Sequence, residues 1–207
     1  MGLFGRKKSP PASDVDDSSP GWESIQTAFA VAFPDVEDLH FAPGAPVSLG
    51  GALDGISAYP TAAGWHFVTF GLTELHTKQS EDTKLSGWGY ELTLLTPPSD
   101  EPPAWALRLL HGLAKATWSS GHPHDIGDRI ALGGPLDGDE SKLTAIAVMS
   151  EPAATPGQFP LGHYAFHRLV GITDGELQDM KDSSTETVLQ RLSATNPLHV
   201  TDPGRAS

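Results

Sequence analysis

Two aromatic-rich segments alternate between apolar and polar positions with the period of two that is typical of sheet strands. They are WHFVTFGL at 65–72 and SGWGYELTLL at 86–95. Both faces of the first segment are partly apolar, which indicates a strand inside a sheet. In the second segment one face is apolar and the other carries Glu91. The pattern predicts two paired strands whose side chains build the sheet core, namely Trp65, Phe67, Trp88, Tyr90 and Leu92.

The connection between these two strands, from Thr73 to Leu85, is polar and longer than a plain hairpin needs. A loop of this length is usually functional or disordered. Glu74 ends the first strand, and together with Glu91 it could in principle act as a pair of acid–base catalysts. The alternative for both carboxylates is a surface salt bridge or a capping role in the loop.

Helical spacing of apolar residues predicts two longer helices. Between Trp22 and Phe33 the apolar stripe is an amphipathic first helix, stopped by Pro34. The stronger pattern covers 104–118, where two prolines begin the helix and Gly121 ends it. Its apolar side is expected to consist of Leu107, Leu110, Ala114 and Trp118.

Shorter patterns complete the set of predicted elements. A β-like run covers 56–59, and two further strands are predicted at 143–149 and 164–171. Thr173 followed by Glu176 has the spacing of a capping box, which predicts a helix there, and another short helix covers about 185–192. This order predicts an α/β (α+β) fold, a mixed β-sheet flanked by helices in a single domain.

The predicted domain covers residues 21–203, with a tail at each end. Residues 1–20 are basic, then rich in Ser, Pro and Asp, and they are expected to be disordered because they offer little apolar surface. Residues 204–207 form the second predicted tail. With 207 residues, 22 glycines, 18 prolines and no cysteine, the chain suits one turn-rich domain without disulfides. It has no apolar run of membrane-spanning length and no signal-peptide core, so we expect a cytoplasmic protein.

The charged residues are unevenly distributed along the chain. Arg6, Lys7 and Lys8 leave 10 Lys and Arg against 26 Asp and Glu in residues 9–207, a net charge of −16 for that part. Such a body repels phosphate backbones and favours basic partners, so nucleic-acid binding is not expected; solubility is the plainer explanation. The three basic residues beside Leu3 and Phe4 provide one weak membrane signal, and stable anchoring normally takes two.

One segment is dense in residues that can bind metals. His122, His124, Asp125 and Asp128 lie within 121–128, and His163 and His167 could join them. Imidazole and carboxylate ligands suit zinc and other transition metals, so a metal-dependent enzyme built on His122, His124 and Asp125 is the alternative function. Ordinary turn histidines are the competing explanation. Because no nucleotide-binding or other catalytic motif is present, no cofactor and no enzymatic activity are predicted.

Six motifs in order carry a family resemblance. They are LGGALDGISAYP (49–60), WHFVTFGLTEL (65–75), SGWGYELTLL (86–95), PPAWALRLLHGLAKATW (102–118), LTAIAV (143–148) and FHRLVGITDGEL (166–177). With these motifs, residues 21–203 resemble the Suppressor of fused domain family in its stand-alone bacterial form.

The resemblance implies a mixed α/β domain that binds protein and has no known enzymatic role. In bacteria, similar domains are proposed immunity proteins that neutralise toxins, and the animal relatives bind a transcription factor, so either an immunity protein or a regulatory interaction module is expected. The partner-binding segment of the family lies in the loop after the WHF strand, which implies the contact residues Glu74, His76, Lys78, Glu81, Asp82 and Thr83. A family tyrosine is His76 here and an aspartate is Thr83, so the animal partner is not carried over.

Overall fold

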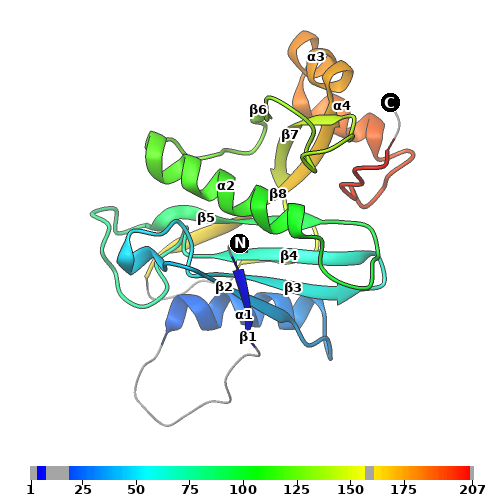
Figure 1. Cartoon of the computed structure of the whole chain (residues 1–207). Coiled ribbons are helices and arrows are strands. Elements are labelled where there is room, and N and C mark those ends of the chain that lie inside the picture. Colours follow the sequence, from blue (N-terminus) through cyan, green and yellow to red (C-terminus); the bar gives the residue numbers. More distant parts are fainter. Residues whose placement is uncertain (1–3, 8–18, 157–160, 206–207) are drawn as a thin grey trace.

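The computed structural model describes residues 4–7, 19–156 and 161–205 (Figure 1). Its helices and strands are β1 (Phe4–Lys7), α1 (Pro20–Ala32), β2 (Leu39–Pro43), the 3-10 turn η1 (Val47–Leu49), β3 (Gly55–Thr61), β4 (Gly64–Phe70), β5 (Leu85–Leu95), α2 (Ala104–Ser120), β6 (Arg129–Ala131), β7 (Leu143–Ser150), β8 (His163–Thr173), α3 (Asp174–Asp182) and α4 (Thr185–Leu192). Within these described ranges, no helix is long and apolar enough to cross a membrane.

The strands in the described part of the chain form a single eight-stranded sheet in the order β1-β2-β3-β4-β5-β8-β7-β6. Strands β1 to β5 are antiparallel neighbours, and so are β8, β7 and β6. The two groups meet where β5 pairs with β8 in parallel. The sheet is therefore mixed, as the sequence predicts, with β4 and β5 as antiparallel neighbours in its middle.

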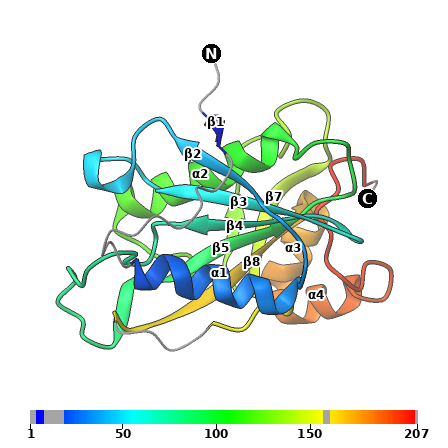
Figure 2. The same cartoon turned by 90° about the horizontal axis from the view of Figure 1, so that it is seen from below.

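Helices cover both faces of this sheet. In Figure 2, which views the molecule from the α1 side, α1 lies in front of the sheet and α2 lies behind it. Helices α3 and α4 pack against β7 and β8. Alternate residues of one strand accordingly enter different clusters: Ile146 of β7 packs with α2, whereas its neighbours Ala145 and Ala147 pack with α3 and α4. Coverage on both faces explains why every residue of β4 is buried.

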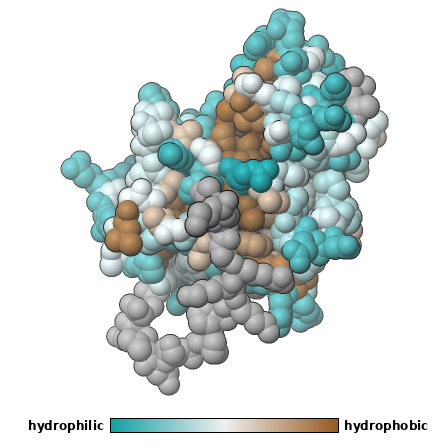
Figure 3. Space-filling view, in the orientation of Figure 1, coloured by the Kyte–Doolittle hydropathy of each residue, from teal (hydrophilic) through white to brown (hydrophobic). Residues whose placement is uncertain are grey.

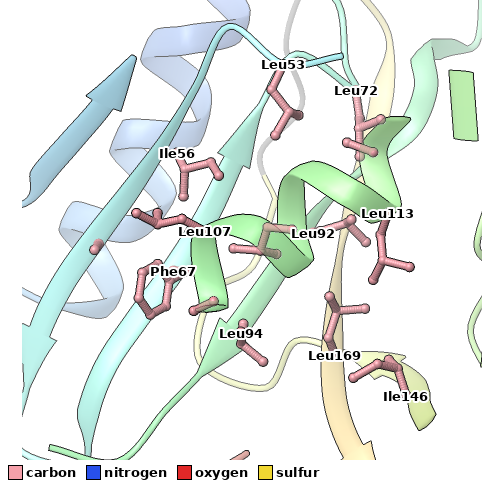
Figure 4. Close-up of a cluster of buried hydrophobic side chains, with 14 of the residues drawn as sticks. Leu53, Ile56, Phe67, Leu72, Leu92, Leu94, Leu107, Leu113, Ile146 and Leu169 are labelled. Atoms are coloured by element: carbon pink, nitrogen blue, oxygen red, sulfur yellow. The ribbon is translucent and has the colours of Figure 1, made fainter. Parts of the chain in front are cut away.

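The main cluster of apolar side chains lies between α2 and the sheet (Figure 4). Leu107, Leu110 and Leu113 of α2 meet Phe67 of β4 and Leu92 of β5, among others. Fully burying a side chain of this size contributes about 1.5–3 kcal/mol. This layer therefore fixes the position of α2 and, with it, the position of Trp118 in its last turn.

The predicted elements are present, and their limits agree closely in the second half of the chain. The capping box is formed: Thr173 Oγ1 accepts from Glu176 N–H, and the Glu176 carboxylate accepts from Thr173 N–H. Strands β2 and β6 were not predicted. Both are short, and none of their residues is fully buried, so they lack the apolar alternation that identifies a strand.

Three ordered features fall within the predicted tails. Phe4–Lys7 is a strand paired with β2, because an edge strand offers unpaired N–H and C=O groups to any segment that reaches it. Helix α1 begins at Pro20. Arg205, expected in the second tail, donates to both carboxylate oxygens of Glu176. The rest of the predicted tails, residues 1–3, 8–18 and 206–207, lies outside the described residues.

Candidate functional site

A break in the sheet forms the base of the candidate site. The parallel ladder between β5 and β8 is interrupted between Leu85 and Tyr90. Gly87 and Gly89 have φ of 54° and 82°, a region that favours glycine, and Trp88 N–H donates to Leu72 O at 2.9 Å. The sequence SGWG thus bulges away from β8 and leaves Trp88 half-buried, packed against the main core cluster that it was predicted to help build.

Glu91 holds the start of the loop that follows β4. Its side chain is fully buried and accepts hydrogen bonds from Gly71 N–H, from Thr73 N–H and Oγ1, and from Thr69 Oγ1, at 2.6–2.9 Å. Burial raises the pKa of Glu91 to about 7, although these hydrogen bonds oppose the shift. Because Glu91 has no exposed surface, it supports the loop and cannot reach a substrate.

Glu74 organises the next turn of the same loop. Its Oε1 accepts from the backbone N–H groups of Gln79 and Ser80, and its Oε2 accepts from Lys78 Nζ at 2.8 Å. Burial opposes ionisation of Glu74, but the hydrogen bonds from Lys78 and the backbone outweigh it and lower the pKa. Of the two roles that the sequence left open for Glu74 and Glu91, the structure therefore has loop capping.

A cavity of about 630 Å³ lies between this loop, η1 and the end of α2. Trp88 and Trp118 line one part of it, with ring centroids 5.4 Å apart and planes at 86°. Trp118 Nε1 donates to Ala52 O at 3.0 Å, and its side chain is 43% exposed. Trp118, which the sequence places on the apolar side of this helix, lies in the last turn of α2, past the buried stripe that ends at Thr117.

Polar side chains also line this cavity. Asp54, just before β3, accepts from Val47 N–H through Oδ1 at 3.1 Å. Burial raises the pKa of Asp54, while the hydrogen bond from Val47 and the nearby His76 oppose that shift. His76 Nδ1 lies 2.8 Å from Ser19 Oγ, which ties the loop to the start of α1.

The predicted contact residues have three different positions. Glu74 and His76 line the cavity, and Lys78 is paired with Glu74 inside the loop. Glu81, Asp82 and Thr83 are exposed at the loop's outer end and do not line the cavity. Asp82 Oδ1 also accepts from Lys84 N–H and Leu85 N–H, so this side chain holds a turn.

Asp54, Trp88 and Trp118 are among the lining residues that sequence reasoning missed. A signal existed for Trp88, because a tryptophan between two glycines inside a strand pattern indicates a bulge. Asp54 had no such signal, since a single aspartate before a strand is common in turns. The outer surface beside the cavity is also apolar in one place, where Figure 3 shows a brown patch over η1 and Leu49 is 77% exposed.

Several of the candidate metal ligands are neighbours, but the hydrogen bonds found among them involve backbone groups. His122 Nδ1 contacts Ser120 O, His167 Nδ1 donates to the backbone oxygen of His124, and Asp128 Oδ2 accepts from Asp125 N–H. Within residues 4–7, 19–156 and 161–205, no three His, Cys, Asp or Glu side chains are grouped so that they could hold a metal ion. The geometry therefore gives no support to the hypothesis that His122, His124 and Asp125 bind a metal ion.

A second polar cluster lies inside the molecule. Glu151 accepts from Arg168 Nε and Nη2, both at 2.7 Å, and from Thr93 Oγ1 at 2.6 Å, while His66 Nε2 lies 3.0 Å from its Oε2. Arg168 and His66 are 2% exposed, and Glu151 is 9% exposed. Because these groups are paired with one another and closed to solvent, the cluster is structural.

Comparison with known proteins places this geometry in a family. The family described as Suppressor of fused protein (SUFU) matches residues 51–206. The Suppressor of fused homologues of Homo sapiens and Mus musculus are each 31% identical over 153 residues, covering 68% of this chain and 32% of theirs. The chain thus spans about a third of the length of the curated relatives it matches.

Solved structures of relatives have the same fold. The crystal structure of a Sufu–Fu complex superposes with a TM-score of 0.85 at 26% identity, covering 92% of both chains. The crystal structure of Drosophila Suppressor of Fused superposes with a TM-score of 0.84 at 26% identity, covering 95% of this chain and 53% of that one.

A homologue from Neisseria gonorrhoeae gives a TM-score of 0.62 at 17% identity, covering 89% of this chain and 94% of that one, and it supports the fold alone. The family match over residues 51–206 and the curated relatives agree with the motifs found in the sequence. The chain therefore belongs to the Suppressor of fused family.

Proposed function

We propose that this chain is a non-enzymatic protein-binding domain and that its contact surface is the loop Thr73–Leu85 with the cavity beside it. The observation that carries the proposal is the combination of an open, aromatic-lined cavity with loop carboxylates that are already used as caps. Such a site offers shape and charge to a partner, and its two glutamates hold the loop in place instead of forming an acid–base pair.

The proposed partner is a basic protein. The −16 charge of residues 9–207 favours it, and an exposed acidic loop end at Glu81 and Asp82 adds a local negative potential. A related chain is known in a complex with Fu, which supports protein binding as the mode of action. For this chain we propose a cytoplasmic role either as an immunity protein that neutralises a toxin domain or as a regulatory interaction module.

The first test is affinity capture from the native cells at low salt, comparing the wild-type chain with Glu81→Lys. Glu81 is exposed, and a charge reversal there repels a basic partner without touching Glu74 or Glu91. Glu140→Lys, at an exposed position between β6 and β7, is the matched control. We expect one protein to be captured by wild type and control and lost with Glu81→Lys, as read by quantitative mass spectrometry.

The captured protein is then purified and its affinity measured by calorimetry at two salt concentrations. A dissociation constant that rises with salt and with Glu81→Lys supports the proposal. Equal binding by wild type and Glu81→Lys would contradict the proposed surface. Protection of cells that co-express the captured protein separates the immunity role from a regulatory one.

A further inference from the structure

The cavity beside the loop has acidic and aromatic walls and lacks a lysine or arginine among its lining residues. Of its two carboxylates, Glu74 has both oxygens engaged by the loop backbone and Lys78. Asp54 differs, because Val47 N–H is its one hydrogen-bond donor in the described part of the chain and binds Oδ1. Asp54 Oδ2 is left for a ligand.

Asp54 is half-buried, so its carboxylate has lost part of its hydration, and among the described lining residues of the cavity the nearby His76 is the basic side chain that offsets this loss. A partner's cation would restore that interaction and would favour the ionised form. The position of the carboxylate is fixed, since Val47 in η1 holds one of its oxygens. The charge is therefore already in place before any ligand arrives.

The two indoles define what kind of cation fits. Trp88 and Trp118 line the same cavity with perpendicular rings, and tryptophan is the aromatic side chain that attracts cations most strongly. Trp118 is held by its hydrogen bond to Ala52 O, and Trp88 by the bulge between Gly87 and Gly89. Neither ring has to be reorganised for binding.

We propose that this cavity binds an arginine side chain of the partner protein, with the guanidinium on Asp54 and against the indoles of Trp88 and Trp118. Arginine fits better than lysine because its planar guanidinium both stacks on aromatic rings and pairs with a carboxylate through two N–H groups. A volume of about 630 Å³ also leaves room for residues flanking that arginine. This inference rests on the proposed protein-binding function and specifies its partner chemistry.

The test uses the ¹⁵N-labelled full chain and two probes, N-acetyl-arginine methylamide and its neutral isostere N-acetyl-citrulline methylamide. The indole N–H signals of the five tryptophans are followed by NMR, and Trp88→Phe and Trp118→Phe assign the two signals of the cavity. We expect the arginine probe to move these two signals and the citrulline probe to bind roughly tenfold more weakly.

Asp54→Asn is the decisive variant, because asparagine can still accept from Val47 N–H while removing the charge. We expect Asp54→Asn to weaken the binding of the arginine probe by roughly tenfold. Asp139→Asn, at an exposed position remote in sequence from the cavity, should leave the binding of this probe unchanged. Unmoved signals of Trp22, Trp65 and Trp105 show that the variant is folded.

Equal effects of the two probes, no movement of the two cavity signals, or full binding by Asp54→Asn would overturn the inference. The probes involve no protein partner, so this result is independent of the capture experiment. If Glu81→Lys abolishes partner binding while the arginine probe fails, the protein-binding function stands and the arginine site falls.

Discussion

At the scale of single residues, buried carboxylates are the groups whose roles differ most from what the sequence suggests. Glu91 occupies a polar position of an alternating strand, which predicts contact with solvent on an uncovered face. Helix α1 covers that side of the sheet, and Glu91 instead accepts four hydrogen bonds from Thr69, Gly71 and Thr73. Its burial couples the protonation of one side chain to the conformation of the loop.

The pH dependence of Glu91 can be predicted with its sign. The folded pKa, about 7, lies above the ordinary value of 4.5, so the folded state binds more protons between these two pH values. The contribution of Glu91 to stability is thus present below pH 4.5 and is lost as the pH rises through about 7, amounting to roughly 3 kcal/mol.

Glu91→Gln tests this dependence, since glutamine keeps the shape and does not titrate. We expect the difference in unfolding free energy between wild type and Glu91→Gln to move against wild type from pH 4.5 to 7.5, in urea unfolding followed by circular dichroism. Taking the difference cancels the contributions of the other titrating groups. A difference that stays constant over this range would contradict the role given to Glu91.

At the scale of elements, the bulge in β5 connects backbone geometry to the cavity. A Cβ added at Gly87 would lie 2.5 Å from Leu72 O, and its φ of 54° is unfavourable for alanine. Gly87→Ala should therefore break the contact between the bulge and the loop, cost about 1–3 kcal/mol and displace Trp88. The measurements are urea unfolding and the position of the Trp88 indole signal.

Gly112→Ala provides the matched control for this variant. Gly112 is an exposed position in α2 where an added Cβ has no neighbour within 4 Å, so the same substitution should stabilise the helix by up to about 1 kcal/mol. Opposite signs for the two variants are the expected outcome. A neutral Gly87→Ala with an unmoved Trp88 signal would show that the bulge does not depend on glycine.

The elements also show what the sequence could and could not predict. Periodicity identified α1, α2 and the strands from β3 to β8 except β6, because a buried face repeats along each of them. Strands β2 and β6 were not predicted because they are short and none of their residues is fully buried. In the candidate site, the loop was predictable from its length and polarity. The bulge at Trp88 was predictable from the glycines on either side of this tryptophan. Asp54 and Trp118 were not, because their approach to the loop depends on how α2 and η1 pack.

At the scale of the whole molecule, the buried cluster of His66, Glu151 and Arg168 joins β4, β8 and the loop after β7 to the end of the chain. Arg168 Nη1 also donates to Leu198 O, and Thr201 N–H donates to Leu95 O. Burial alone would raise the pKa of Glu151, but His66 and Arg168 outweigh it and hold that pKa well below its usual range. The C-terminal segment is thereby part of the fold.

Removing one charge of this cluster should destabilise the whole domain. Glu151→Gln leaves Arg168 buried without its counter-charge, which typically costs about 3–5 kcal/mol. Because the pKa of Glu151 is lowered on folding, its stabilising contribution is present above pH 4.5 and lost as the pH falls below that value. Wild type should therefore lose its advantage over Glu151→Gln in acid, measured by urea unfolding. An unchanged stability at neutral pH would contradict the structural role of the cluster.

The parallel junction between β5 and β8 has a consequence for how the chain folds in time. On either side of it, neighbouring strands are also consecutive in the chain, so they close shorter loops than β5 and β8, which are separated by α2, β6 and β7. The cavity lies beside the break in this junction, but all of its lining residues lie between Val47 and Trp118 and therefore precede β8 in the chain. During synthesis, every residue of the proposed binding surface therefore emerges before β8, the strand that joins the two halves of the sheet.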